Sequence, residues 1–363
     1  MQSPHLTRFD RRLLAAAAWL AFAGSASAQN YTQTNLVSNQ TGAAANTDAN
    51  LVNGWGISRS ASSPWWVSDN GTSVATLYNS SGTPNSLVVK VAGGPTGTVF
   101  NGTAGFVITG GSPAKFLFCS LNGAISGWNG GTAATVMATT PNAVYTGLAM
   151  ATVNGNPQLY AADFAGGKID VFDASFNLVS KPQPAFWLLS FLFGNLSFGP
   201  NPPGMSPFNI QNIGGTLFVA YAKPDPTTHQ NAVGAGLGLI GAFTPTGQLI
   251  AWFQHVDELN APWGFAMAPS EFGTFSHDLL VGQLGSGQIL AFNPESGQYM
   301  GQLLNPAGAP IAIDGLWGIG FGNGGNAGPE TTLFFAAGPN GQTNGLFGSL
   351  TAVTADLIQG NGN

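Results

Sequence analysis

A unit of about 50 residues recurs along this chain of 363 residues, and it constrains the fold more than any other feature. The recurring unit is a short aromatic-glycine strand, a second apolar strand, a Gly or Asn turn, and a third apolar strand, and the aromatic-glycine pair itself stands at 55–56, 263–264 and 317–318. The first strands of four copies are anchored by Trp55, Phe208, Trp263 and Trp317, which lie one or more units apart. Short apolar strands separated by Gly, Asn and Pro at this period are typical of propeller blades. The sequence therefore predicts an all-β fold, a six-bladed β-propeller.

The six copies give the expected positions of most strands. First strands are expected at 55–57, 147–149, 208–210, 263–265 and 317–319, with none recognised in the second copy. Second strands are expected at 65–71, 116–118, 159–163, 217–221, 279–282 and 333–337. Third strands are expected at 75–78, 124–128, 168–173, 239–243, 288–292 and 346–350. We expect the glycine beside each anchor to let neighbouring blades approach, because the innermost strands crowd around the axis.

One strand is left over at the N-terminus. Residues 31–38 alternate Thr32 and Thr34 with Leu36, and no unit precedes them. The sixth unit ends near Val353, so this segment is predicted to supply the outer strand of the sixth blade and to close the ring. Closure by both ends of the chain removes exposed sheet edges. We therefore expect one propeller domain over residues 29–353, a disordered tail over 354–363, and a monomer.

Residues 1–28 have the three parts of an export signal. Three arginines lie before residue 13, an apolar core of eleven residues spans 13–23, and Ala26-Ser27-Ala28 suits a signal peptidase. The core is shorter than the roughly 20 residues that a bilayer span needs, and no later stretch of that length lacks polar breaks. We therefore expect a mature chain that begins at Gln29, has no membrane span and is exported to the periplasm or the medium. The alternative is a buried N-terminal helix.

The charge balance excludes some partners. The chain has 9 Lys and Arg against 15 Asp and Glu, and without residues 1–28 these become 6 and 14, a formal charge of −8. A nucleic-acid-binding protein needs a basic stripe, and an anionic membrane attracts basic segments, so neither partner is expected. Cys119 is the only cysteine, so no disulfide can form within the chain. Its apolar setting indicates a small core residue rather than a catalytic thiol.

Six stretches spread over the chain carry a family resemblance. They are TNLVS (34–38), LVNGWGI (51–57), WVSDNG (66–71), ISGWN (125–129), PFNIQNIGG (207–215) and LWGIGFG (316–322). At these residues the chain resembles a family of exported bacterial proteins without an established activity, which are predicted to be six-bladed propellers related to NHL-repeat domains. Many members of that family end in a PEP-CTERM sorting tail with Pro-Glu-Pro, a membrane span and basic residues. This sequence ends at Asn363 without such a tail, so we expect release rather than anchoring.

Candidate ligand-binding residues gather on one predicted face, which we term the top face. In propellers the loops between second and third strands share this face with the loops that enter the first strands. The candidates placed there by the unit alignment are Asn53, Asp69, Asn70, Asp163, Asn209, Lys223, His229, Asn260, Gln283, Asp314 and Asn340. Asp69 and Asp163 occupy equivalent positions two blades apart, and carboxylates around a narrow mouth favour a divalent cation, so these two predict a calcium site. In the alternative interpretation each Asp or Asn only hydrogen-bonds its own turn.

Most enzyme templates are absent from the sequence, which contains no G-x-S-x-G elbow, no H-E-x-x-H and no cysteine pair. The calcium-dependent lactonases of the gluconolactonase family are six-bladed propellers that bind metal through a Glu and several Asn or Asp residues. No Glu lies at an early strand end here, so Asp163 or Asp69 would have to replace it. We predict a secreted module that binds an unknown small molecule, glycan or protein. The alternatives are a calcium-assisted hydrolase, lactonase or lyase that uses top-face carboxylates, and a structural component of an extracellular matrix or surface.

Two insertions interrupt the units. Residues 223–236 lengthen the top-face loop of the fourth blade, where they could form a lid. Residues 186–198 are rich in Phe and Leu and lie between the third and fourth blades. They are expected to form either a hydrophobic plug under the gap between these blades or an apolar contact surface for a partner.

Overall fold

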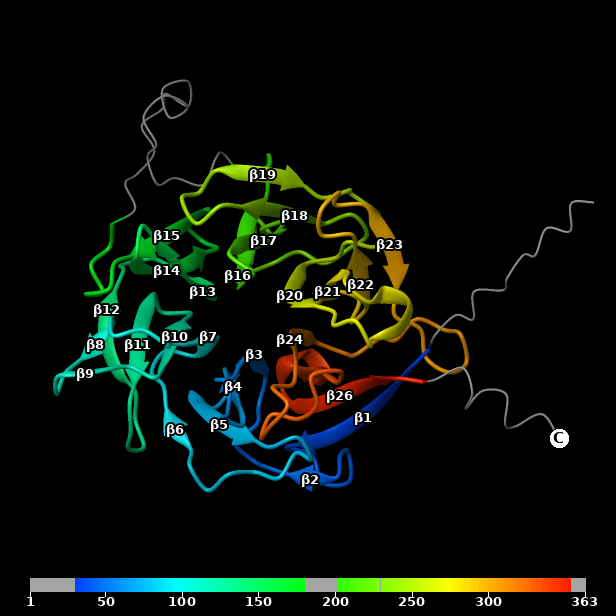
Figure 1. The fold of residues 1–363 in the computed structure, drawn as a ribbon, viewed down its shortest axis with the longest axis horizontal. Helices are drawn as coiled ribbons and strands as arrows, with labels where there is room; N and C mark the ends of the chain where they lie inside the picture. The colour runs from blue at the N-terminus through cyan, green and yellow to red at the C-terminus, as the bar shows by residue number, and fades with distance from the viewer. Residues whose placement is uncertain (1–29, 180–200, 229, 354–363) are drawn as a thin grey trace, which may run out of the picture.

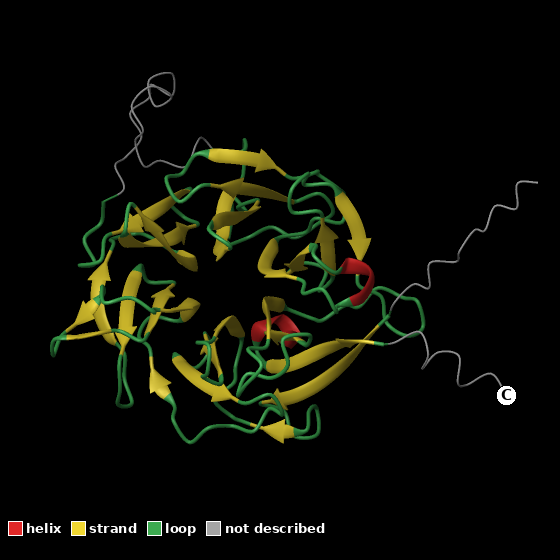
Figure 2. Cartoon of the chain, viewed as in Figure 1, coloured by secondary structure: helices red, strands yellow, loops and turns green. Residues whose placement is uncertain are grey.

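Six antiparallel sheets stand in a ring around one axis, as Figure 1 shows. The computed structural model describes residues 30–179, 201–228 and 230–353. Within these residues nearly all regular structure is strand (Figure 2), and the helical turns are η1 (Gly273–Phe275) and α2 (Pro339–Gln342). The predicted six-bladed β-propeller is confirmed.

Each blade is one sheet, and in blades 1 to 5 the strands follow one another outward from the axis. Blade 1 contains β3 (Gly54–Ser58), β4 (Trp65–Asp69), β5 (Val74–Tyr78) and β6 (Val89–Lys90). Blade 2 contains β7 (Pro95–Phe100), β10 (Phe116–Ser120), β11 (Ala124–Trp128) and β12 (Thr135–Thr139), with a separate hairpin of β8 (Val107–Ile108) and β9 (Ser112–Pro113). Blade 3 contains β13 (Tyr145–Val153), β14 (Asn156–Asp163) and β15 (Lys168–Phe172). Blade 4 contains β16 (Ser206–Ile213), β17 (Thr216–Ala222), β18 (Gly238–Phe243) and β19 (Leu249–Trp252). Blade 5 contains β20 (Pro262–Met267), β21 (Leu279–Gln283), β22 (Ile289–Phe292) and β23 (Tyr299–Gln302). Blade 6 contains β24 (Leu316–Phe321), β25 (Leu333–Ala337), β26 (Leu346–Ala352), β1 (Tyr31–Ser38) and β2 (Asn46–Thr47).

The repeat units correspond to these blades, with one strand missed. The innermost strand of blade 2 is β7, which has Thr96 where blades 1, 4, 5 and 6 have an aromatic anchor, and blade 3 likewise has a threonine, Thr146. The Thr96 hydroxyl donates a hydrogen bond to the carbonyl oxygen of Tyr145 in blade 3 at 2.7 Å. A hydrogen bond thus replaces aromatic packing at this position, which explains why the aromatic pattern did not reveal the strand.

The innermost strands approach one another closely at one position in each blade. Five blades have glycine there, directly after the anchor position: Gly56, Gly97, Gly147, Gly264 and Gly318. A Cβ atom on Gly264 would lie 2.4 Å from the carbonyl oxygen of Trp317 in the next blade, closer than two such atoms can come. Blade 4 has Asn209 instead, and its Nδ2 donates a hydrogen bond to the carbonyl oxygen of Trp263 at 2.7 Å. The expected role of the repeated glycine in letting blades approach is confirmed.

The N-terminal strand closes the ring. β1 pairs antiparallel with β26, from Tyr31 opposite Ala352 to Ser38 opposite Leu346, and β2 adds a short parallel strand beyond it. The Tyr31 hydroxyl, on a fully buried side chain, donates a hydrogen bond to the carbonyl oxygen of Phe272 in blade 5 at 2.9 Å. The predicted closure is therefore confirmed, and it fastens blade 6 to its neighbour as well as to the chain start.

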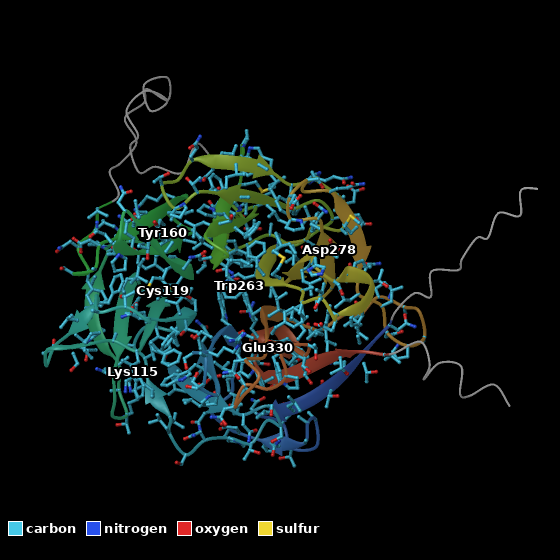
Figure 3. All side chains as sticks on the ribbon, viewed as in Figure 1. Lys115, Cys119, Tyr160, Trp263, Asp278 and Glu330 are labelled. Atoms are coloured by element: carbon cyan, nitrogen blue, oxygen red, sulfur yellow. The ribbon has the colours of Figure 1, made fainter. Side chains whose placement is uncertain are left out.

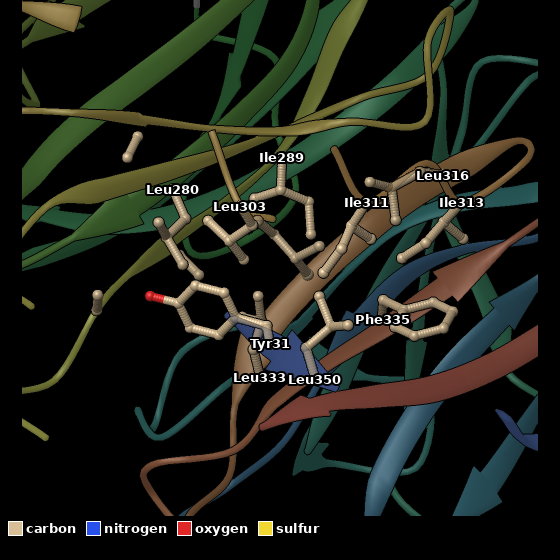
Figure 4. Packing of buried hydrophobic residues seen from close by; sticks show 14 of the residues in the cluster. Tyr31, Leu280, Ile289, Leu303, Ile311, Ile313, Leu316, Leu333, Phe335 and Leu350 are labelled. Atoms are coloured by element: carbon tan, nitrogen blue, oxygen red, sulfur yellow. The ribbon is translucent and has the colours of Figure 1, made fainter. Parts of the chain in front are cut away.

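The apolar core lies between neighbouring blades. Figure 4 shows one such cluster, in which Tyr31 packs among leucines and isoleucines of blades 5 and 6. Its labelled members are Tyr31, Leu280, Ile289, Leu303, Ile311, Ile313, Leu316, Leu333, Phe335 and Leu350. Each fully buried side chain of this kind contributes about 1.5–3 kcal/mol, so the interfaces between blades hold the ring together.

Some predictions fall on residues outside the described ranges. These are the export signal (1–28), the apolar insertion (186–198), the tail (354–363) and His229. Among the described residues, none of the helices has the length and apolar character needed to cross a bilayer. Cys119 is fully buried, and burial raises the pKa of its thiol to about 11, in keeping with the predicted core residue.

Removing residues 29–38 should destabilise the propeller, because the deletion exposes β26 and empties the Tyr31 site. Tyr31→Ala alone should lower the free energy of unfolding by about 3–5 kcal/mol, the usual cost of deleting a large buried ring. Thr32→Ala, at an exposed position of the same strand, is the control and should change little. Urea denaturation measures all three, and an unchanged midpoint for the deletion would contradict ring closure.

Gly264→Ala should also be destabilising, by about 1–3 kcal/mol, because its methyl group would collide with backbone rather than with a flexible side chain. Gly325→Ala is the matched control, since a Cβ there meets only Asn323 Oδ1 at 3.5 Å. Thermal unfolding of both variants measures the difference. Equal melting temperatures for the two variants would mean that the close approach of the innermost strands does not require a glycine at position 264.

Candidate functional site

Aromatic side chains close the axis at the end where the first strands begin. Four anchors from blades 1, 4, 5 and 6 meet there and form the aromatic plug: Trp55, Phe208, Trp263 and Trp317. Trp55 stacks on Trp317 with ring centroids 3.5 Å apart, and Trp263 meets both edge-on. The Trp263 Nε1 donates a hydrogen bond to the carbonyl oxygen of Thr146 in blade 3 at 2.9 Å, and Figure 3 shows Trp263 near the centre of the ring. No plug residue is more than 5% exposed, so the top-face end of the axis is filled.

Three pairs of predicted site residues are brought together, each pair within one blade. Asn53 Nδ2 donates to Asn70 Oδ1 at 3.3 Å, and Asn53 Oδ1 accepts a hydrogen bond from the Trp317 indole at 3.1 Å. The backbone N–H of Asn260 donates a hydrogen bond to Gln283 Oε1 at 2.9 Å. Each of these pairs ties the loop entering a blade to the end of its second strand or the loop that follows.

Asp314 and Asn340 form the third pair, since Asp314 Oδ2 accepts a hydrogen bond from the backbone N–H of Asn340 at 2.8 Å. Asn209 lies on the axis, in the ring of close approach. Lys223 is exposed at the base of the 223–236 loop, where its carbonyl oxygen accepts the Ala232 amide N–H. Most of the predicted site residues therefore lie in separate blades around the plug, and Asn209 is the one that also lines the axial channel on the other side of it.

Asp163 serves its own turn. Its Oδ1 accepts the backbone N–H groups of Val144 and Gly166 at 3.0 and 2.9 Å. Its Oδ2 lies 3.5 Å from Lys168 Nζ, which also contacts Asp170. These contacts agree with the alternative interpretation, in which Asp163 hydrogen-bonds its own turn. The sequence analysis did not predict the positive charge of Lys168 beside it.

Asp69 occupies the equivalent position in blade 1 but has Val74 opposite it instead of a lysine. It is fully buried, and neither carboxylate oxygen has a hydrogen-bond partner within the described part of the chain. Burial raises the pKa of Asp69 well above its usual range, and the nearby charge of Asp48 adds to the shift while Thr76 opposes it. Burial therefore favours the protonated, neutral form of Asp69 in the folded chain.

The calcium site stays a prediction. Within residues 30–179, 201–228 and 230–353, no three His, Cys, Asp or Glu side chains are grouped in a way that could hold a metal ion. A calcium ion between Asp69 and Asp163 would need oxygen ligands from other residue types, and six or more are usual for this ion.

A channel opens at the opposite end of the axis, between the innermost strands. It encloses about 480 Å³, and the plug residue Trp263 contributes to its inner end. Three rings of residues line it, taken from the three positions that follow the close-approach position in each innermost strand. The inner ring is Ile57, Thr98, Leu148, Ile210, Phe265 and Ile319. The middle ring is Ser58, Val99, Ala149, Gln211, Ala266 and Gly320. The outer ring is Arg59, Phe100, Met150, Asn212, Met267 and Phe321.

The sequence analysis missed these channel residues, although a signal for them was present. They occupy fixed offsets from the aromatic-glycine pair of each unit. The polar top-face residues drew attention instead, because turn residues and ligand-binding residues have the same composition.

The polar groups of the channel are few. Gln211 Nε2 donates to the carbonyl oxygen of Phe265 at 2.8 Å, and the hydroxyl oxygens of Ser58 and Thr98 lie 3.2 Å apart. No Asp, Glu, His or Cys is among the described residues that line the channel, so Arg59 is its one ionised side chain.

Arg59 lies at the mouth of the channel and joins blade 1 to blade 6. Its Nε donates to the carbonyl oxygen of Phe321 at 2.6 Å, and its Nη2 donates to that of Gly322 at 2.9 Å. The guanidinium carbon lies 5.6 Å from the centre of the Trp65 ring, in a cation–π arrangement. Burial lowers the pKa of Arg59, and the charge of exposed Glu330 opposes this shift, so the guanidinium stays protonated.

The neutral state of Asp69 predicts a pH dependence. The folded chain keeps a proton that the unfolded chain loses above the ordinary value of 3.8, so the contribution of Asp69 to stability falls as the pH rises from there toward its raised pKa. The slope is at most about 1.4 kcal/mol per pH unit. Asp69→Asn should therefore gain stability relative to the wild type as the pH rises above about 4, measured by urea denaturation. Asp257→Asn, at an exposed position, is the control, and a pH-independent difference for Asp69→Asn would contradict the neutral acid.

No family model matches the sequence. Uncharacterized protein R648 of Acanthamoeba polyphaga mimivirus is 36% identical to it over 337 residues, which cover 87% of this chain and 78% of that protein. Uncharacterized protein L690 of the same virus is 33% identical over 337 residues, covering 87% of this chain and 84% of that protein.

Solved structures share the fold at low identity. A protein of unknown function from Bacteroides thetaiotaomicron has a TM-score of 0.51 and 11% identity, covering 89% of this chain and 76% of that one. Virginiamycin B lyase from Staphylococcus aureus has a TM-score of 0.50 and 14% identity, covering 90% of this chain and 100% of that one. At such identities the likeness concerns the fold alone, and it supports the propeller that the family resemblance implied. The bacterial origin and export of the resembled family stay predictions. By sequence, this six-bladed β-propeller belongs to the family that includes the mimivirus proteins R648 and L690.

Proposed function

We propose that the protein is a binding module that takes a small organic molecule into its axial channel. The observation that carries this proposal is the channel itself, about 480 Å³ in volume and lined by all six blades. Ligand pockets commonly have volumes of about 300–1,000 Å³, apolar walls and a few placed polar groups. The outer ring fits this description, since partly exposed apolar side chains such as Phe100 and Met150 lie there beside the polar Arg59 and Asn212.

The lining favours binding over catalysis. General acid–base and nucleophilic mechanisms need a side chain such as His, Asp, Glu, Cys or Lys beside the reacting atoms. The described lining residues include none of these, and Arg59 keeps its proton. A hydrolase or lactonase that uses top-face carboxylates would need an open axis at that face, where the plug lies. Export of the module stays a prediction from residues 1–28.

The channel implies a ligand with a flat or narrow apolar body. Its accessible apolar wall is at the outer ring, where the partly exposed side chains of Phe100, Met150, Met267 and Phe321 offer dispersion contacts. A neutral bicyclic aromatic amide, naphthalene-2-carboxamide, is a probe of suitable shape. At about 0.3 kcal/mol per non-hydrogen atom, such a probe should bind with a Kd of about 1 mM or lower.

Calorimetric titration with naphthalene-2-carboxamide tests the proposal. We expect one site per chain and abolished binding in Ser58→Trp, because an indole at the middle ring would occupy the channel. Ser62→Trp places the same side chain at an exposed position of the same blade and should bind like the wild type. Absence of binding to the wild type, or equal binding to both tryptophan variants, would overturn the proposal.

A further inference from the structure

We propose that Arg59 anchors a carboxylate of the ligand, so that the channel selects organic acids over neutral molecules of the same shape. This inference rests on the proposed function of the channel as a binding site. It specifies the ligand class, organic acids, and the residue that recognises the carboxylate, Arg59.

The guanidinium of Arg59 has N–H donors that its hydrogen bonds within the protein do not use. An arginine carries five N–H donors, and two of these are used by the carbonyl oxygens of Phe321 and Gly322. The other three have no partner among the described residues. A carboxylate accepts two parallel hydrogen bonds from a guanidinium, which matches what remains.

Arg59 also makes no ion pair within 4.0 Å among the described residues, although the charge of Glu330 acts on it from a greater distance. The ion pairs in the described part of the chain are those of Lys168 with Asp163 and Asp170. No carboxylate oxygen of the described residues lies within 4.0 Å of the Arg59 nitrogens, and no acidic residue is among those that line the channel. A half-buried charge without a partner is costly, and a ligand carboxylate would offset that cost.

The guanidinium is held in place before a ligand arrives. Its two bonds to carbonyl oxygens fix its plane, and the Trp65 ring lies beneath it at 5.6 Å. A donor group already held in its bound geometry loses little entropy on binding, so its hydrogen bonds favour the complex more strongly. The held geometry thus supports a role in recognition in addition to its role in joining blades 1 and 6.

The charge of the rest of the molecule sharpens the selection. Beyond residue 28 the chain has 6 Lys and Arg against 14 Asp and Glu, so an anion is repelled by most of the surface. A positive group at the mouth of a low-dielectric channel attracts an anion locally. Arg59 is the only arginine in that part of the sequence, and it lies at this mouth.

Two probes of one shape separate charge from fit. Naphthalene-2-carboxylate and naphthalene-2-carboxamide differ in a single group, and each is titrated into the wild type, Arg59→Met, Arg59→Lys and Lys115→Met. The wild type should bind the carboxylate at least about tenfold more tightly, the effect of a charge-assisted hydrogen bond worth about 1.5–3 kcal/mol. Arg59→Met should lose this preference while it still binds the carboxamide, and Arg59→Lys should keep part of it. Lys115→Met removes an equal charge at an exposed position away from the axis, where Figure 3 shows Lys115. This variant should keep the full preference for the carboxylate.

The outcomes distinguish the two proposals. Equal affinity of the wild type for both probes, or an unchanged preference in Arg59→Met, would overturn the carboxylate anchor and leave the binding channel standing. Binding of neither probe to the wild type would overturn the channel itself. Loss of carboxamide binding in Arg59→Met, with the preference also lost in Lys115→Met, would show a general charge or stability effect and would likewise sink the assignment.

Discussion

The close approach of the innermost strands determines the rest of this structure. At the glycine that follows each anchor, the neighbouring backbone occupies the space that a Cβ atom would need, as at Gly264 beside the Trp317 carbonyl oxygen. The strands therefore meet at one height along the axis. Beyond that height the channel opens between the strands, and the later residues carry side chains at every position except Gly320. A closed end and an open end of the axis follow from this one contact.

Side chains before and after the glycine have different roles. Those before it are driven toward the axis where the strands are closest, and indole rings such as those of Trp55 and Trp263 fill the space. Those after it line a widening channel. The proposed binding site therefore lies away from the top face, where polar loop residues hold the loops of one blade together and also join neighbouring blades, as Asn53 does with Trp317.

The fold was predictable because the repeat consists of aromatic anchors, glycines and turn residues, each of which has a structural role in a propeller blade. The strand that escaped, β7, has Thr96 at its anchor position and reaches blade 3 by a hydrogen bond instead of by aromatic contact. The site was harder to predict, since turn-forming Asp and Asn residues look like ligands in a sequence. Asp69 and Asp163 share a motif, yet only register shows that one faces Val74 and the other Lys168. The channel could have been found by offset from the anchors, but its closed end could not, because sequence does not show that indoles from separate blades meet.

Asp69 and Arg59 are both ionisable groups without an ionic partner in the described structure, and they resolve this in opposite ways. The carboxyl group of Asp69 is fully buried, and burial raises its pKa, which favours the form without a charge. A guanidinium cannot give up its proton at physiological pH, even where burial lowers its pKa, as it does for Arg59. Its charge has to be balanced by solvent or by an anion. Of the two groups, Arg59 keeps a charge that an anionic ligand would balance at the mouth of the channel, and this is the basis of the proposed carboxylate anchor.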